Sequence, residues 1–204
     1  MKIVSERTDF DPIRFRFKSL THWPQLLITI LSPNIVLERV VYITYVRSLN
    51  GIPQIEPKIR VRVRIGEFRD LKKLTKLVVS CPDFYLETLR RRHELGLIRR
   101  LRDGDICFLA ENEKGDIVGM LWVVFRQSFV REWYRALSVK MQPREALLYD
   151  AFVVPQYRGN RIFEKLLEEA LGFLGEKQYL RAYTQVSYEN VPSTKSALRV
   201  GFRP

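Results

Sequence analysis

The sequence predicts an α/β fold, in which helices flank a mixed central sheet, preceded by an N-terminal extension that contains strands. Strand-type alternation and helix-type apolar spacing follow one another along residues 58–204. Residues 146–154 form a strongly apolar run, compatible with a strand buried on both faces. Two prolines and an Asn-Gly pair interrupt residues 49–57. These observations predict an extension of unknown role at residues 1–57 and an α/β domain at residues 58–204.

Three segments of the extension carry a secondary-structure signal. Residues 10–18 alternate apolar and basic side chains, which is typical of a half-buried strand. Residues 22–31 are short and apolar, and helix and strand both remain open for them. Residues 36–46 are rich in β-branched and aromatic side chains and are predicted to form one strand.

The second part predicts its elements in the order β-α-α-β-β-β-α-β-α. Strands are indicated by alternation or by continuous apolar runs at residues 58–65, 105–110, 117–125, 146–154 and 179–186. Helices are indicated by apolar residues three or four positions apart at residues 67–79, 83–101, 160–176 and 192–200. Gly201 follows the last helix, where a left-handed residue is expected. Residues 127–145 are predicted to be irregular.

The formal net charge of +12 favours anionic partners, among them nucleic acid, anionic lipid and CoA. No apolar stretch approaches the ~20 residues that a transmembrane helix needs. The first residues also lack the apolar segment of a secretory signal, so a cytoplasmic location is expected. Two cysteines and two histidines do not suit a structural metal site, and no metal ligands are assigned. Cys107 is expected to be a small buried hydrophobe.

Two groups of arginines are interpreted first as solvated faces. Arg60, Arg62 and Arg64 alternate with apolar residues, and are predicted to line the wet face of a strand. A second group lies on the predicted helix at 83–101 and just after it: Arg90, Arg91, Arg92, Arg99, Arg100 and Arg102. Contact of this second group with a polyanion or an acidic substrate is the alternative.

A tight basic loop, residues 156–161, separates the strand at 146–154 from the helix at 160–176. A helix that begins just after a glycine presents unpaired backbone N–H groups and the positive end of its dipole. Gly159 lets the backbone approach a phosphate, and Arg158 and Arg161 add charge-assisted donors. The loop is therefore a candidate site for an anion.

A second motif follows the strand at 179–186. Tyr188-Glu189-Asn190 is followed by Ser193 and by a helix that closes on Gly201-Phe202. Together, this motif and the sequence Val153-Val154-Pro155-Gln156-Tyr157-Arg158-Gly159-Asn160 resemble the pyrophosphate-binding and second motifs of the GNAT acetyltransferase superfamily. The resemblance covers roughly residues 58–202, and the order of elements is similar too.

The resemblance implies transfer of an acetyl or longer acyl group from acetyl-CoA or another acyl-CoA directly to an amine acceptor. It implies that the strand carrying residues 152–154 separates from the next strand and pairs with the pantetheine arm, and that a backbone N–H there polarises the thioester. The cofactor-binding residues that it implies are Phe152, Val153, Val154, Gln156, Arg158, Gly159, Asn160, Arg161, Ile162, Asn190 and Ser193.

Three residues are the catalytic candidates. Asp150 is the first choice for substrate binding or proton removal, because a carboxylate within an apolar strand is costly unless it is paired or functional. Pairing with an arginine or the backbone is the alternative. Tyr149 is a weaker candidate for the base. Tyr188 is a candidate for the acid, because Ala197 stands where many family members place a tyrosine; Ser193, water or unassisted departure of the thiolate are alternatives.

The chain departs from the family pattern at two further points. Arg161 occupies a position that is usually Gly or Ala, and the sequence stops at Pro204, where the family adds a closing hairpin. The N-terminal strands or a partner subunit, as in a homodimer, could cover that edge. The alternative function is a non-catalytic module that binds an anionic partner, such as RNA, ribosome or a membrane surface, through its basic faces.

Overall fold

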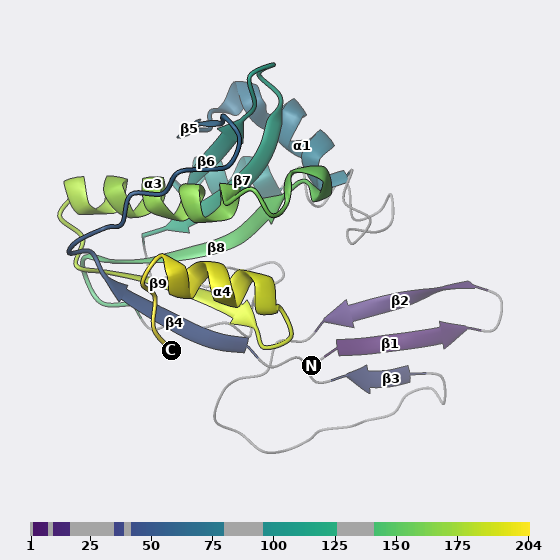
Figure 1. Cartoon of the computed structure of the whole chain (residues 1–204). Helices are drawn as coiled ribbons and strands as arrows, with labels where there is room; N and C mark the ends of the chain where they lie inside the picture. Colours follow the sequence, from purple (N-terminus) through teal and green to yellow (C-terminus); the bar gives the residue numbers. More distant parts are fainter. Residues whose placement is uncertain (1, 8–9, 17–34, 39–41, 80–95, 126–140) are drawn as a thin grey trace.

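The structure is a computed structural model and describes residues 2–7, 10–16, 35–38, 42–79, 96–125 and 141–204. Its strands form two sheets, one of three strands and one of six (Figure 1). Helices cover both faces of the larger sheet, so the predicted α/β class with a mixed, helix-flanked sheet is confirmed.

The three-stranded sheet lies in the N-terminal extension and has the order β2-β1-β3. Its strands are β1 (Lys2–Arg7), β2 (Phe10–Arg16) and β3 (Ile35–Glu38), and both pairings are antiparallel. β2 confirms the strand predicted within residues 10–18. The apolar segment at 22–31 lies outside the described residues.

The six-stranded sheet has the order β4-β9-β8-β7-β6-β5. Its strands are β4 (Tyr42–Ser48), β5 (Arg62–Ile65), β6 (Ile106–Glu111), β7 (Ile117–Val124), β8 (Glu145–Val153) and β9 (Arg181–Ser187). Only β8 and β9 pair in parallel, which makes the sheet mixed. The five strands predicted from residue 58 onward are all present, with ends shifted by a few residues.

The prediction of one strand at residues 36–46 is wrong, because the segment is divided between two sheets. Its first part is β3, whereas β4 pairs antiparallel with β9 over its whole length. A run of β-branched residues indicates extended chain but does not mark where the chain passes from one sheet to another. β4 thus covers the edge of β9, as proposed for an N-terminal strand, and the large sheet extends across the boundary at residue 57.

The helices form a layer on each side of the large sheet (Figure 1). One face carries η1 (Phe68–Asp70), α1 (Leu71–Val79) and a helical segment at 96–102. The other face carries α3 (Ile162–Glu176) and α4 (Val191–Arg199). The predicted helices at 67–79, 160–176 and 192–200 are confirmed; residues 83–95 of the remaining one lie outside the described residues.

Each face of the sheet has its own apolar core. All eight residues of β7 are buried, since this strand lies in the middle of the sheet between the two helical layers. On the α3 side, Leu166, Leu167 and Leu171 are fully buried against the sheet. Cys107 is also fully buried, and burial raises the pKa of its thiol, as expected of a structural cysteine.

The expectation that Arg64 lies on a wet strand face is wrong. Arg64 forms ion pairs with Asp70 and Glu111, with N–O distances of 2.7 Å in each case, whereas Ile65 is 41% exposed. β5 is an edge strand, and η1 folds back so that Asp70 meets Arg64. Arg60 and Arg62 are exposed as predicted.

Asp70→Asn is expected to destabilise the protein by roughly 2 kcal/mol at neutral pH, because the bond to Arg64 lowers the pKa of Asp70 from 3.8 to about 2. A lowered pKa stabilises the fold above pH 3.8, and this contribution disappears as the pH falls through about 2. Urea denaturation at several pH values should therefore show the difference between wild type and variant shrinking in acid. Asp103→Asn, at an exposed ion pair with Arg99, is the control. A pH-independent difference would contradict this origin of the stability.

Candidate functional site

β8 and β9 separate halfway along their length. Their parallel pairing runs from Glu145–Arg181 to Leu148–Thr184, although β8 continues to Val153 and β9 to Ser187. Beyond Thr184, β9 stays paired with β4. The separation predicted for the strand carrying residues 152–154 is therefore present, and within the described residues no strand pairs with the β9-facing edge of that segment.

A β-bulge lies at the point where the two strands separate. Between the pairs Trp122–Tyr149 and Met120–Phe152, β7 has one residue and β8 has two. The extra residue bends the strand, and Asp150 adopts a left-handed backbone with φ of 49°. Such a conformation is uncommon for a residue other than glycine, and bulges often redirect a side chain next to a functional site. Because of the bulge, the side chains of Tyr149 and Phe152 lie on the same face of the sheet, whereas a regular strand would place them on opposite faces.

The loop predicted to bind an anion begins directly at the end of β8. Val154 donates its N–H to the Val118 carbonyl (2.9 Å), and a single 3-10 turn, η2 (Pro155–Tyr157), follows. Arg158 lies exposed after this turn; its Nε donates to the Val153 carbonyl (3.0 Å) and its guanidinium lies 5.8 Å from the Phe152 ring centroid. Residues 152, 153 and 158, all predicted cofactor ligands, are thus brought together.

The backbone of the loop is left-handed at Gly159 and at Arg161, with φ of 81° and 59°. A Cβ atom added to Gly159 would have no neighbour within 4 Å, so open space lies beside it. Arg161 is the N-cap residue of α3. The side chain that replaces the family's usual Gly or Ala is therefore accommodated in a conformation that costs an L-residue roughly 1–2 kcal/mol.

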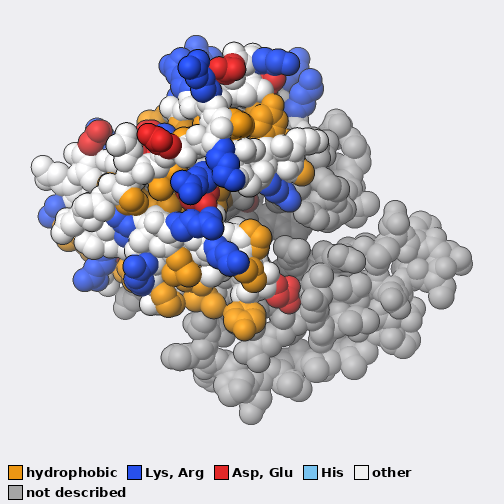
Figure 2. All heavy atoms as spheres, in the orientation of Figure 1, with side chains coloured by type: hydrophobic (Ala, Val, Ile, Leu, Met, Phe, Trp, Pro, Cys, Tyr) orange, Lys and Arg blue, Asp and Glu red, His pale blue; other side chains and the backbone are white. Residues whose placement is uncertain are grey.

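The first turn of α3 presents its backbone toward the loop. The side chain of Ile162 is buried in the core (1% exposed), which leaves only its main chain for a ligand. The first four N–H groups of an α-helix have no acceptor within the helix, and Arg158 and Arg161 are exposed beside them. Figure 2 shows further Lys and Arg side chains over this face of the molecule. Backbone donors and positive charge at one place are the combination that favours a bound anion, as the sequence predicts for this loop.

Neighbouring segments hold the loop in place. Asn112, in the turn after β6, donates to the Tyr157 hydroxyl (3.0 Å), and the Asn160 side chain donates to the Tyr157 carbonyl (3.1 Å). The Asn160 carbonyl accepts the N–H of Lys58 (3.1 Å), which directly follows the linker, residues 49–57. Gln156 is exposed on η2, and its side chain makes no hydrogen bond to the other described residues that would hold the loop.

The second motif forms the start and the end of α4. Asn190 is its N-cap, and the side-chain oxygen accepts the N–H of Ser193 (3.2 Å). Gly201 ends the helix with φ of 94°, as predicted. Ala197 is fully buried against α3 and contributes packing, not a polar group. Tyr188 is 68% exposed at the end of β9.

On the opposite face of the sheet, the bulge is surrounded by charged and aromatic side chains. Asp150 forms an ion pair with Arg100, whose guanidinium lies 5.2 Å from the Trp122 ring centroid and 5.1 Å from that of Tyr149. The Tyr149 hydroxyl donates to Asp105 (2.7 Å). Burial raises the pKa of Tyr149 well above its usual value, so the phenol stays protonated and acts as a donor.

The expectation that Arg100 lies on a solvated helix face is wrong, because its side chain is only 19% exposed and contacts Asp150 and Trp122. Arg100 follows Leu97 by three residues and precedes the half-buried Leu101 by one. On a helix these positions share one face, so the apolar stripe was the signal that could have identified Arg100 as inward-facing. Residues 90–92 lie outside the described residues, as do residues 127–140 of the segment predicted to be irregular.

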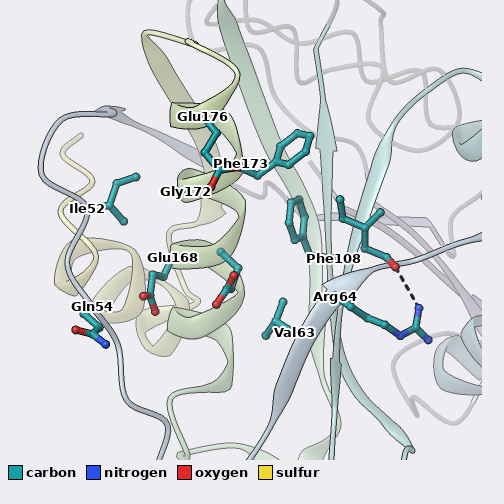
Figure 3. A pocket seen from close by; sticks show the side chains of 11 residues that line it. Ile52, Gln54, Val63, Arg64, Phe108, Glu168, Gly172, Phe173 and Glu176 are labelled. Carbon is teal, nitrogen blue, oxygen red and sulfur yellow. Dashed lines mark hydrogen bonds between the residues drawn. The ribbon is translucent and has the colours of Figure 1, made fainter.

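A separate pocket of about 470 Å³ lies between α3, β5, β6 and the linker (Figure 3). Its wall combines Phe108 and Phe173 with Glu168 and other side chains. Glu168 already accepts the N–H of Ile55 (3.0 Å) and pairs with Lys165 (3.0 Å). None of the lining residues belongs to the loop or to the bulge.

Comparison with known proteins identifies a family. Residues 71–202 match the family model described as "Acetyltransferase (GNAT) family". No curated protein sequence matches the chain. The fold resembles that of a solved structure described as AAC(6')-Iy in complex with a CoA-containing bisubstrate analog, with 18% identity and a TM-score of 0.54 over 71% of this chain and 92% of that one. It also resembles the aminoglycoside 6'-N-acetyltransferase AAC(6')-Ih from Acinetobacter baumannii, with 17% identity and a TM-score of 0.54 over 71% of this chain and 92% of that one. A third similar structure is described as a probable acetyltransferase, with 23% identity and a TM-score of 0.57 over 70% of this chain and 90% of that one. Within the described residues, no helix is long and apolar enough to cross a membrane.

Proposed function

This chain belongs to the GNAT acetyltransferase family, and on that premise we propose that it transfers an acetyl or longer acyl group from acyl-CoA to a primary amine. The observation that supports this most strongly is the separation of β8 from β9, which ends directly at the basic loop before α3. An extended arm with a pyrophosphate at one end and a thioester at the other matches this combination of a free strand edge and an anion site.

The residues present fit acyl-CoA. Gly159 has open space beside it, and Arg158 and Arg161 are exposed at the helix start. Together with the N–H groups of the first turn of α3, they would hold the pyrophosphate. The β8 segment carrying residues 152–154 would pair with the pantetheine amides, and Asn190 and Ser193 would contact its far side. We also propose a cytoplasmic location for the protein.

The transfer itself needs an unprotonated amine and a polarised carbonyl. The amine nitrogen attacks the thioester carbon, the C–N bond forms, the C–S bond breaks, and the sulfur leaves as a thiolate that takes up a proton. A backbone N–H at the free edge of β8 would stabilise the oxyanion. Asp150, at the bulge, would accept the proton that the ammonium must lose. The exposed Tyr188 is the candidate for the acid that returns a proton to the thiolate. Tyr149 is the weaker candidate for the base, and its raised pKa keeps the phenol protonated.

We expect calorimetric titration to show that CoA and acetyl-CoA bind with dissociation constants on the order of micromolar. A panel of primary amines is then screened by the release of free CoA thiol. Asp150→Asn should lower kcat about 100-fold, because general-base catalysis contributes 10²–10⁴, and should leave the affinity for CoA unchanged. Asp103→Asn is the control, since Asp103 is exposed and pairs with Arg99, not with Arg100. No binding of CoA by the folded wild type would overturn the proposal.

A further inference from the structure

Asp150 carries a charge in an environment that does not suit an isolated one. Its side chain is 16% exposed, and its neighbours on β8 and β7 include the buried side chains of Tyr149 and Trp122. The left-handed backbone of the bulge places it out of the normal alternation of the strand. A carboxylate in such a place needs a cation to hold it, and a base needs a fixed direction toward its proton.

Arg100 supplies the cation and is itself held tightly. Its side chain is 19% exposed and lies against the rings of both Trp122 and Tyr149, where the faces of the aromatic systems attract the guanidinium. The Trp122 ring is fully buried and cannot move aside without disturbing the core. A planar guanidinium can stack in this way and still donate to a carboxylate, whereas the compact ammonium of lysine is a poorer match.

A second chain of contacts links the same elements. The Arg100 carbonyl accepts the N–H of Asp105 (2.9 Å), and Asp105 accepts the Tyr149 hydroxyl (2.7 Å). Tyr149 directly precedes Asp150 in β8. The end of the helical segment at 96–102, the start of β6 and the bulge are therefore connected twice, by the side chain of Arg100 and by its main chain.

We propose that Arg100 is a positioning residue. It holds the Asp150 carboxylate at the β8 bulge so that the carboxylate points toward the acceptor amine. This inference rests on the proposed function, because Asp150 is the residue through which Arg100 acts. A purely structural ion pair is the competing explanation, since many buried pairs serve only to satisfy each other. The two explanations can be told apart with two kinds of amine. A positioning role predicts that loss of Arg100 slows only the amines that must lose a proton before attack, whereas a structural role predicts no difference between the two kinds.

The test compares two kinds of acceptor in Arg100→Met and Arg100→Lys. Neamine and spermidine are protonated at neutral pH and must lose a proton before attack, whereas hydroxylamine is largely neutral and needs no such deprotonation before it attacks. For the protonated polyamine, Arg100→Met should lower kcat about 100-fold, the loss expected when a catalytic group is misplaced. Turnover with hydroxylamine and the affinity for CoA should stay within about threefold of wild type, and Arg100→Lys should recover part of the loss.

Arg99→Met is the matched control, because Arg99 neighbours Arg100 in sequence but is exposed and pairs with Asp103. Adding Asp150→Asn to Arg100→Met should cause no further loss, since both changes act through one carboxylate. An equal loss with hydroxylamine and polyamine, or additive losses in the double variant, would overturn the positioning role. Failure of the proposed function shows itself separately, as a folded wild type that does not bind CoA.

Discussion

Replacing Gly159 with glutamate is expected to abolish measurable binding of CoA. Two effects add at this position. The backbone φ of 81° is one that an L-residue adopts only with strain of roughly 1–2 kcal/mol. The new carboxylate would also stand at the start of α3, in the open space beside Gly159, where the negative pyrophosphate is proposed to lie. Like charges at close range, and the loss of access to the backbone N–H groups, should weaken binding at least about 100-fold.

The control for strain is Gly104→Glu. Gly104 has nearly the same backbone angle, 83°, and likewise no atom within 4 Å of an added Cβ, but it follows the helical segment at 96–102 and not the loop. Both variants should lose similar thermal stability, whereas calorimetry should detect CoA binding only in Gly104→Glu. Retention of wild-type affinity by Gly159→Glu would exclude the loop as the pyrophosphate site.

The loop could be predicted from the sequence because its features are local. A glycine between arginines at the junction of a strand and a helix predicts an anion site within six residues. The structure shows the left-handed glycine, the helix start and the exposed cations in those places. The described elements between residues 62 and 199 were predictable for the same reason, since their apolar periods are properties of short segments.

The features that the sequence did not reveal depend on long-range pairing. Arg64 is neutralised by Asp70 and by Glu111, which lies 47 positions away, and the alternating pattern of β5 contains no sign of either. Asp150 and Arg100 are 50 positions apart, so the sequence could suggest that Asp150 needed a partner but could not identify it. The bulge has no signal of its own, because Asp150 and Ala151 fit a regular strand pattern equally well.

The largest structural effect is expected from the removal of β4. A chain that begins at residue 58, where the composition changes, should fail to fold, whereas a chain that begins at residue 40 should fold and bind CoA. In the shorter chain β9 would lose its seven-residue partner and become an open edge of the sheet. The exposed edge of β9 would carry unpaired N–H and C=O groups, and such an edge promotes aggregation.

The side chains that β4 and the residue after it bury also predict that their removal unfolds the protein. Tyr45 and Leu49 are 3% and 9% exposed in the core under α3 and α4, and each buried side chain of this size contributes about 1.5–3 kcal/mol. Arg47, also buried, donates to the carbonyls of Val200 and Gly51 and so ties the end of α4 to the linker. The loss of these contacts together is comparable to the roughly 5–15 kcal/mol by which a whole domain is stable.

β4 also orders the end of the chain. Val46 and Arg203 exchange two backbone hydrogen bonds, of 2.7 and 2.8 Å, and the neighbouring Phe202 is fully buried. Phe202 closes the helix that begins at Asn190, so loss of β4 should reach the second motif of the proposed cofactor site. Calorimetric unfolding and CoA titration of the two shortened chains test this. A cooperative transition and wild-type CoA affinity in the chain from residue 58 would mean that the large sheet is stable without its N-terminal strand.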